Sequence, residues 1–185
     1  MMRKLLTLVA GLALTATVAA ADIGQGRKDL QVFNDISKAV TRYAQFTIFD
    51  SVDASVKDGV VTLTGRVTMP YKKEELEKRV AKIDGVRQVH DQISVLPVSQ
   101  FDDQLRYRIA RAIYSNPNFW NYAIMADPPV HIVVEHSRVT LTGVVQSEVD
   151  RMLARSIATS QFGVMSVVNN LKTEAESRDA LEKAF

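Results

Sequence analysis

The stretch Val61-Thr62-Leu63-Thr64-Gly65 recurs unchanged as Val139-Thr140-Leu141-Thr142-Gly143, 78 residues further along the chain. The agreement continues past these five residues, since glycine again meets glycine and aliphatic residues meet aliphatic residues at the same offset. The further pairs are Val67 with Val145, Gly85 with Gly163, Val86 with Val164, Val89 with Val167 and Ile93 with Leu171. One supersecondary unit is therefore present twice, and the two copies organise the chain.

The residues around the first copy predict a helix, a β-hairpin, a second helix and a third strand. Apolar residues at three- and four-residue steps over 27–46 are typical of an amphipathic helix. Alternation over 52–56, then Asp58-Gly59, then 61–67 predicts a hairpin, because glycine tolerates the positive φ of a tight turn. Pro70 is suited to open the second helix and Gly85 to end it, and residues 89–95 form the last strand.

The second copy repeats this order. It predicts a helix over 101–114 with Ser99 as its N-cap, strands over 130–134 and 139–145 joined by Ser137-Arg138, a helix over 147–162 and a strand over 164–171. The first helices of the two units align at an offset of 73 residues, whereas the strands align at 78. Five extra residues therefore lie within 115–129 of the second unit. The predicted fold class is α+β, with two tandem αββαβ units, each a small three-stranded mixed sheet packed with two helices.

The first 21 residues carry the pattern of a secretory signal peptide. Arg3 and Lys4 precede an apolar run over 5–18, and Ala19-Ala20-Ala21 suits cleavage before Asp22. An uncleaved anchor is the alternative, although a run of about 14 residues is short of the roughly 20 that span a bilayer. The remaining parts are a flexible lead (22–26), the first unit (27–96), a linker (97–100), the second unit (101–172) and a charged, helix-prone tail (173–185). So short a linker predicts a fixed interface between the units.

Composition narrows the classes of function. The whole chain has 23 Lys and Arg against 21 Asp and Glu, and removal of residues 1–21 takes two basic residues and no acidic ones. A neutral mature chain has no broad basic footprint for nucleic acid. The absence of cysteine excludes disulfides, thiolate metal sites and a lipoprotein anchor. We expect an exported protein, periplasmic rather than secreted, with no membrane span in the mature chain.

The sequence offers no catalytic motif. It contains no nucleophile elbow, no phosphate-binding glycine loop and no zinc-protease helix signature. His131 and His136 stand five residues apart on or near a strand, which places them on opposite faces and prevents them from sharing a metal ion. We therefore expect a protein that is not an enzyme and that holds no metal or cofactor.

Both repeats resemble the BON domain, a family named for bacterial osmotically inducible and nodulation proteins. The residues that carry the resemblance are 58–65 with Gly85, Val86 and Val89, and 139–143 with Gly163, Val164, Val167 and 169–171. The resemblance implies an exported envelope protein with paired domains that binds phospholipid membrane surfaces and supports envelope integrity or the stress response. It also implies, for some members, chaperone-like help to exported proteins. No catalytic residues come with the family.

The candidate contact surface runs from Arg106 to Tyr122. Arginines off the apolar stripe, with aromatic residues beside them and in the insertion, suit an anionic phospholipid surface. The alternative is that the arginines are only a solvated helix face and that Phe119 and Trp120 pack the insertion onto the core or onto the other domain. The candidate lipid-binding residues are Arg106, Tyr107, Arg108, Arg111, Tyr114, Phe119, Trp120 and Tyr122.

The other candidate function is a periplasmic protein-interaction or chaperone-like module that binds envelope proteins. Its motivation is the apolar insertion and the short strands, which leave sheet edges unpaired. The sequence leaves open the ligand and whether the chain forms oligomers.

Overall fold

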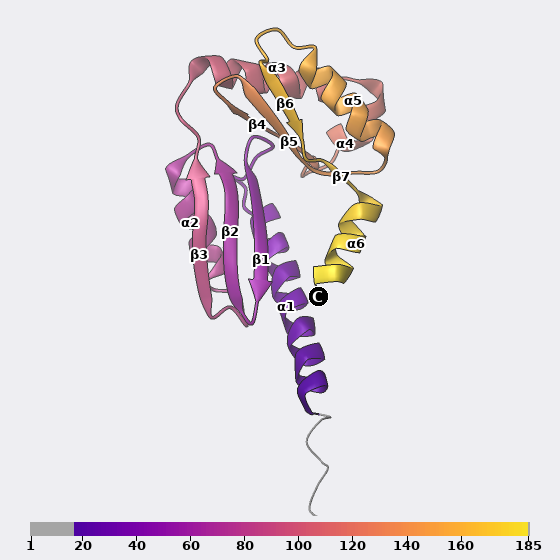
Figure 1. Cartoon of the computed structure of the whole chain (residues 1–185). Helices are drawn as coiled ribbons and strands as arrows, with labels where there is room; N and C mark the ends of the chain where they lie inside the picture. The colour runs from indigo at the N-terminus through magenta and orange to yellow at the C-terminus, as the bar shows by residue number, and fades with distance from the viewer. Residues whose placement is uncertain (1–16, 185) are drawn as a thin grey trace, which may run out of the picture.

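A computed structural model describes residues 17–184 and contains the two predicted units in tandem (Figure 1). The first unit comprises α1 (Thr17–Thr41), β1 (Ser51–Lys57), β2 (Val60–Val67), α2 (Pro70–Val80) and β3 (Gln88–Val95). The second comprises α3 (Gln100–Tyr114), the 3-10 turn η1 (Pro117–Phe119), α4 (Trp120–Ala123), β4 (Val130–Glu135), β5 (Arg138–Val145), α5 (Glu148–Thr159), β6 (Ser166–Asn169), β7 (Lys172–Thr173) and α6 (Glu174–Ala184). The predicted α+β class is confirmed.

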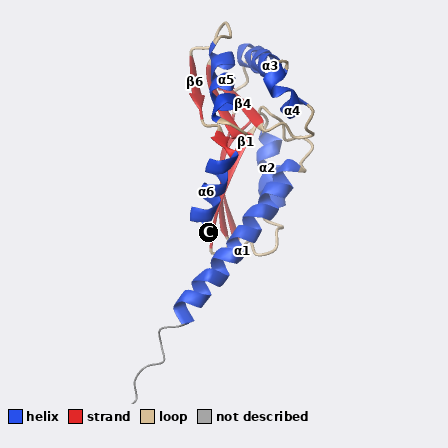
Figure 2. Ribbon diagram, turned by 90° about the vertical axis from the view of Figure 1, so that its right-hand side faces the viewer, coloured by secondary structure: helices blue, strands red, loops and turns tan. Residues whose placement is uncertain are grey.

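The repeated pentapeptide is the central strand of each sheet. In the first unit β2 pairs antiparallel with β1 and parallel with β3, and in the second β5 pairs in the same way with β4 and β6. The short β7 adds a further parallel pair to β5. Val61 and Leu63 are fully buried, and so are their counterparts Val139 and Leu141. The alternation of the pentapeptide therefore buries one side of each sheet beneath its helices (Figure 2).

Gly65 and Gly143 end the repeated stretches because no side chain fits there. Both have positive φ, of 128° and 116°. A Cβ atom on Gly65 would lie 2.1 Å from the carbonyl oxygen of Ser51, and one on Gly143 would lie 1.8 Å from that of Pro129. The glycines thus admit the close approach of the neighbouring strand, as the sequence predicts.

Replacing Gly65 with alanine is expected to lower the free energy of unfolding by about 1–3 kcal/mol, the usual cost of a residue held in a disfavoured conformation. The backbone of Ser51 must also move. Urea unfolding of Gly65→Ala measures the loss, and Thr64→Ala, at the exposed preceding position, is the control. Equal stability of the two variants would show that the close approach imposes no cost.

An aspartate from the first helix of each unit holds the hairpin turn. Asp29 accepts hydrogen bonds from the backbone N–H groups of Asp58 (2.7 Å) and Gly59 (3.0 Å). Asp102, at the equivalent position, accepts from those of the turn residues in the second unit, each at 2.9 Å. Both aspartates are buried. Each carboxylate therefore ties its helix to the end of its sheet.

The predicted second turn is one residue out of place. The turn residues are His136 and Ser137, with φ of 51° and 62°, and Arg138 already belongs to β5. The hydrogen bonds that the two backbone N–H groups donate to Asp102 stabilise this positive-φ conformation without a glycine.

Several predicted helix ends also change. Residues 22–26, expected as a flexible lead, are helical within α1, which ends at Thr41. The helices α2 and α5 end at Val80 and Thr159, and Gly85 and Gly163 lie in the turns that follow, with positive φ. The tail forms α6, as its helix propensity predicts, with no buried residue. Most of the predicted signal peptide, residues 1–16, lies outside the described residues.

The two units share an interface at the ends of β1 and β4, as the short linker predicts. The N–H of Ile132 donates to the carbonyl oxygen of Ile48 at 2.6 Å, and the His131 Nδ1–H donates to that of Asp50 at 2.7 Å. Two polar pairs of side chains also cross the interface, Ser51 with Thr142 at 2.8 Å and Arg66 with Glu135 at 3.3 Å. Backbone hydrogen bonds of this kind fix the units relative to each other.

Candidate functional site

The helix α3 buries one side and exposes the other. Leu105, Ile109 and Ile113 are fully buried in the core of the second unit. Tyr107 and Arg111 are exposed. The Tyr107 ring also contacts the ring of Phe49 in the first unit edge-on, with the ring centroids 4.9 Å apart. The exposed side of α3 therefore extends to the interface with the first unit.

Arg106 does not belong to the exposed surface, contrary to the prediction. Its side chain is buried, its Nη2 donates to the carbonyl oxygen of Val134 at 2.7 Å, and its Nη1 pairs with Asp103. The guanidinium therefore holds α3 against β4. A group with these partners is not available to a phosphate.

Two further predicted residues are partly engaged. Arg108 is half-buried and donates to the carbonyl oxygen of Phe162 at 2.9 Å. Tyr114 donates its hydroxyl to the carbonyl oxygen of Val130 at 2.7 Å and accepts from the N–H of the same residue at 3.1 Å. Burial raises the pKa of Tyr114, so this hydroxyl stays protonated and keeps α3 fixed to the start of β4.

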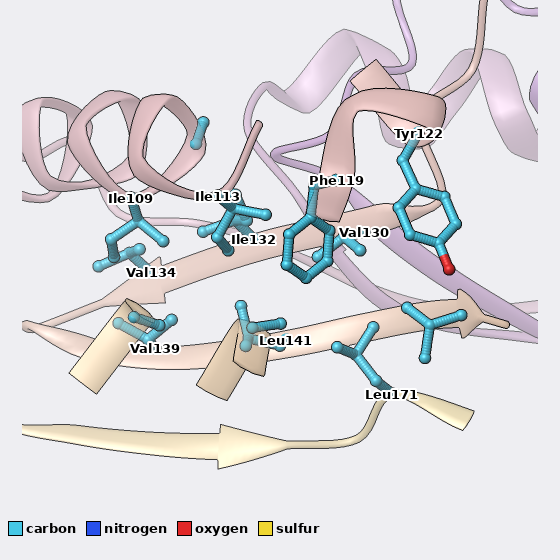
Figure 3. Close-up of a cluster of buried hydrophobic side chains, with 14 of the residues drawn as sticks. Ile109, Ile113, Phe119, Tyr122, Val130, Ile132, Val134, Val139, Leu141 and Leu171 are labelled. Carbon is cyan, nitrogen blue, oxygen red and sulfur yellow. The ribbon is translucent and has the colours of Figure 1, made fainter. Parts of the chain in front are cut away.

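The insertion divides its aromatic residues between core and surface. Figure 3 shows Phe119 and Tyr122 directed at the strands with Val130 and Leu171, and both are buried. Trp120, between them, is 65% exposed. Packing onto the core is thus the correct interpretation for Phe119, and it is wrong for Trp120, which η1 and α4 turn outward with Ile124 and Met125. Tyr122 was predicted as a lipid contact, and its burial removes it from the surface.

Tyr122 connects the insertion to the residues between β5 and α5 and to the first turn of α5. Its hydroxyl accepts from the N–H of Gln146 at 2.8 Å and donates to Asp150 at 3.0 Å, and burial raises its pKa. In the first unit Asp50 holds the equivalent positions, since it accepts from the N–H of Thr68 at 2.7 Å and from Lys72 Nζ at 2.6 Å. The insertion therefore delivers a tyrosine where the first unit has a buried aspartate.

The helix α5 adds exposed residues that the sequence reasoning missed. Val149, Met152 and Arg155 are all exposed, and α5 packs beside α3 over the same core. The missed signal was a comparison of the copies, because Met152 and Arg155 stand where the first copy has Glu74 and Glu77. Together these side chains form what we term the helical face, made of Tyr107, Arg111, Trp120, Ile124, Val149, Met152 and Arg155.

Three acidic groups near the helical face are paired with arginines. Glu148 pairs with Arg151, which also contacts Glu176 at 2.8 Å, and Asp103 pairs with Arg106. Within residues 17–184, the side chains of Arg111 and Arg155 form no hydrogen bond or ion pair, and both are exposed. The face therefore presents two exposed arginines without an ion pair, together with apolar side chains.

A groove of about 1350 Å³ lies between the two units, away from the helical face. The helix α1, the edge strand β1 and the helix α6 line it, and β5 closes one end. The sides present apolar groups, among them Phe33, Val40 and Leu181. This groove is the second candidate site.

Two of the three histidines, His131 and His136, take structural positions. His131 is bonded at the interface and His136 lies in a turn, and across residues 17–184 no group of three acidic or histidine side chains is placed to hold a metal ion. Within the same range, no helix has the length and apolar content needed to cross a bilayer.

Comparison with known proteins identifies a family model that matches both units. A family model described as BON domain covers residues 35–97 and 102–175. A polyribonucleotide nucleotidyltransferase of Dehalococcoides mccartyi is 28% identical over 104 residues, which span 56% of this chain and 14% of that protein.

Two of the solved structures that match this chain are of CdsD, a structural protein of the type III secretion system of Chlamydia trachomatis. One is 14% identical with a TM-score of 0.30, over 81% of this chain and 97% of that chain. The other, its C-terminal domain, is 13% identical with a TM-score of 0.28, over 77% of this chain and 96% of that chain. Neither similarity assigns a function here.

Proposed function

The chain belongs to the BON domain family, and from this premise we propose that it is an exported, non-enzymatic envelope protein that binds anionic phospholipid surfaces through its helical face. The observation that carries the proposal is the composition of that face, which combines exposed apolar side chains with the exposed Arg111 and Arg155. The proposal also places the protein in the periplasm, at a membrane surface, where it contributes to envelope integrity.

Physical chemistry favours a lipid surface for this arrangement. Tryptophan and tyrosine favour the boundary between headgroups and acyl chains, where an apolar ring and a polar group are both accommodated. A basic side chain near an anionic surface contributes about 1 kcal/mol. Two arginines with several apolar contacts give reversible, salt-sensitive binding, as expected of a peripheral protein.

Trp120 is the chain's one tryptophan, so its fluorescence reports directly on the helical face. Addition of phosphatidylglycerol-containing vesicles at low salt is expected to shift its emission to shorter wavelength, because the indole leaves water. Vesicles of phosphatidylcholine alone are expected to give little shift, and about 0.5 M NaCl to reverse it, because salt screens the arginines. Unchanged emission and no co-flotation with anionic vesicles would reject the proposal.

The second candidate function is binding of an extended polypeptide in the groove. Asp58 and Gly59 form a two-residue turn, so Lys57 and Val60 are a hydrogen-bonded pair. By alternation the backbone groups of Val52, Ala54 and Val56 point away from β2, toward the groove. An added strand satisfies such groups.

Leu181→Glu is expected to weaken this second activity, because it places a charge in the apolar wall that α6 provides. Suppression of the aggregation of a reduced, unfolding client protein is the measurement. Lys183→Glu, on the other side of α6, is the control. The groove loses its support if the unaltered protein has no effect at an equimolar ratio.

A further inference from the structure

The second unit ends in a tip that carries three exposed large apolar side chains. Phe162 is 85% exposed and Met165 75% exposed, both in the loop between α5 and β6, and Phe101 is exposed in the first turn of α3. The Phe101 ring lies over Gly163, where a Cβ atom would be 2.8 Å from its Cζ. Figures 1 and 2 both place this loop at the end of the molecule opposite the N-terminal part of α1.

The equivalent tip of the first unit is charged. Lys28 occupies the place of Phe101, Asp84 that of Phe162 and Arg87 that of Met165. The backbone at the two tips is the same, since the N–H of Arg87 donates to the carbonyl oxygen of Gly59 and the N–H of Met165 to that of Ser137. The fold therefore accepts charged residues at all three positions, and the apolar residues of the second unit are not required by packing.

Two arginines lie beside the apolar tip. Arg108 lies beneath Phe162, bonded to its carbonyl oxygen, and Arg138 is exposed at the start of β5. The first copy has Asp35 and Val60 at these two positions. The nearby acids are engaged, because Asp102 is buried against the turn and Glu135 pairs with Arg66.

We infer that this tip enters the interface of an anionic phospholipid bilayer as an apolar wedge. The inference rests on the proposed function and adds the part of the chain that penetrates. Protruding side chains on a convex loop suit the soft boundary of a bilayer, whereas a protein partner for them needs a matching pocket. Arg108 and Arg138 complement anionic headgroups, which selects an anionic lipid surface over a neutral apolar one.

Depth is measured with a tryptophan placed at the tip. In the full chain, Trp120→Phe with Phe162→Trp leaves the one tryptophan at position 162. Vesicles of phosphatidylglycerol with dibrominated acyl chains are expected to quench its fluorescence. A matched protein with Trp120→Phe and Tyr71→Trp, at an exposed position of the first unit, is expected to stay unquenched.

The double variant Phe162→Ser, Met165→Ser is expected to bind phosphatidylglycerol vesicles about 10- to 100-fold more weakly, because it removes two side chains that leave water on binding. Its slope of affinity against salt is expected to stay unchanged, since no charge is altered. Both residues are exposed, and circular dichroism confirms that the variant folds.

Four outcomes separate the inference from the proposed function and from self-association. Quenching at position 162 together with weaker binding of the serine variant supports the wedge. Binding of the unaltered protein with neither effect overturns the wedge and leaves the helical face as the contact. Failure of the unaltered protein to bind anionic vesicles overturns both. Loss of self-association in the serine variant, with vesicle binding intact, assigns the tip to a second copy and also overturns the wedge.

Discussion

Replacing Arg111 and Arg155 together with glutamate is expected to weaken binding to phosphatidylglycerol vesicles by about 1000-fold at low salt. The change alters the charge of the helical face by four units, and each unit near an anionic surface is worth about 1 kcal/mol. Both side chains are exposed, so the variant is expected to fold normally. Vesicle co-sedimentation at about 20 mM salt measures the effect, and the loss shrinks as salt screens the charges.

The matched control reverses two charges on the first unit. Lys57→Glu with Lys82→Glu has the same net charge and also alters exposed residues. If attraction depends on net charge alone, the two proteins lose affinity equally. If the helical face makes the contact, the control binds far better. Equal losses would therefore contradict the assignment of the contact to the second unit.

Replacing Asp50 with alanine is expected to lower the free energy of unfolding by about 3–5 kcal/mol, because it leaves a buried ammonium group without its partner. Lys72 Nζ lies 2.6 Å from the Asp50 carboxylate, and both side chains are almost wholly buried. The carboxylate also accepts hydrogen bonds from the backbone and hydroxyl of Thr47 and Thr68. Urea unfolding measures the loss.

A double variant separates the ion pair from the other hydrogen bonds. Asp50→Ala with Lys72→Met removes both charges and is expected to recover part of the stability. A loss below about 1 kcal/mol in Asp50→Ala alone would show that the pair is not the anchor that its burial indicates.

The same aspartate predicts a dependence on acid. Burial alone would raise the pKa of Asp50, but the hydrogen bonds from Lys72, Thr68 and Thr47 outweigh it, and the pKa lies below its ordinary value. A carboxyl with a lowered folded pKa contributes stability that is present above its unfolded pKa, about 3.9, and is lost as pH falls below it. Unfolding curves between about pH 6 and pH 2 are expected to show this loss in the unaltered protein and less of it in Asp50→Asn.

The fold was predictable because its signals are local and repeated. The alternation and glycines of the pentapeptide, with Asp58-Gly59 and Pro70, identify the strands and the second helix of the first unit. The second turn was misplaced since His136 and Ser137 take positive φ only with the help of Asp102, which is 34 residues away. Such a long-range contact has no local pattern.

The site was predictable only in part, because composition does not show which polar residues find partners. Arg106 and Arg111 look alike in the sequence, yet one is bonded to Val134 and the other is exposed. Phe119 and Trp120 are neighbours, and the 3-10 turn sends them in opposite directions. Comparison of the copies is more informative, since it identifies Met152 and Phe162 as positions where charge has been replaced by apolar surface.

In the proposed function the second unit faces the membrane and the first does not. The chain has no cysteine, so Met152→Cys and Glu74→Cys each give one labelling site, at equivalent positions of the two copies. Each protein is labelled with an environment-sensitive fluorophore and mixed with phosphatidylglycerol vesicles at low salt. We predict a blue shift and stronger emission from the label at position 152 and no change from the label at position 74. Equal responses, or a response at position 74 alone, would reject the assignment of the membrane contact to the second unit.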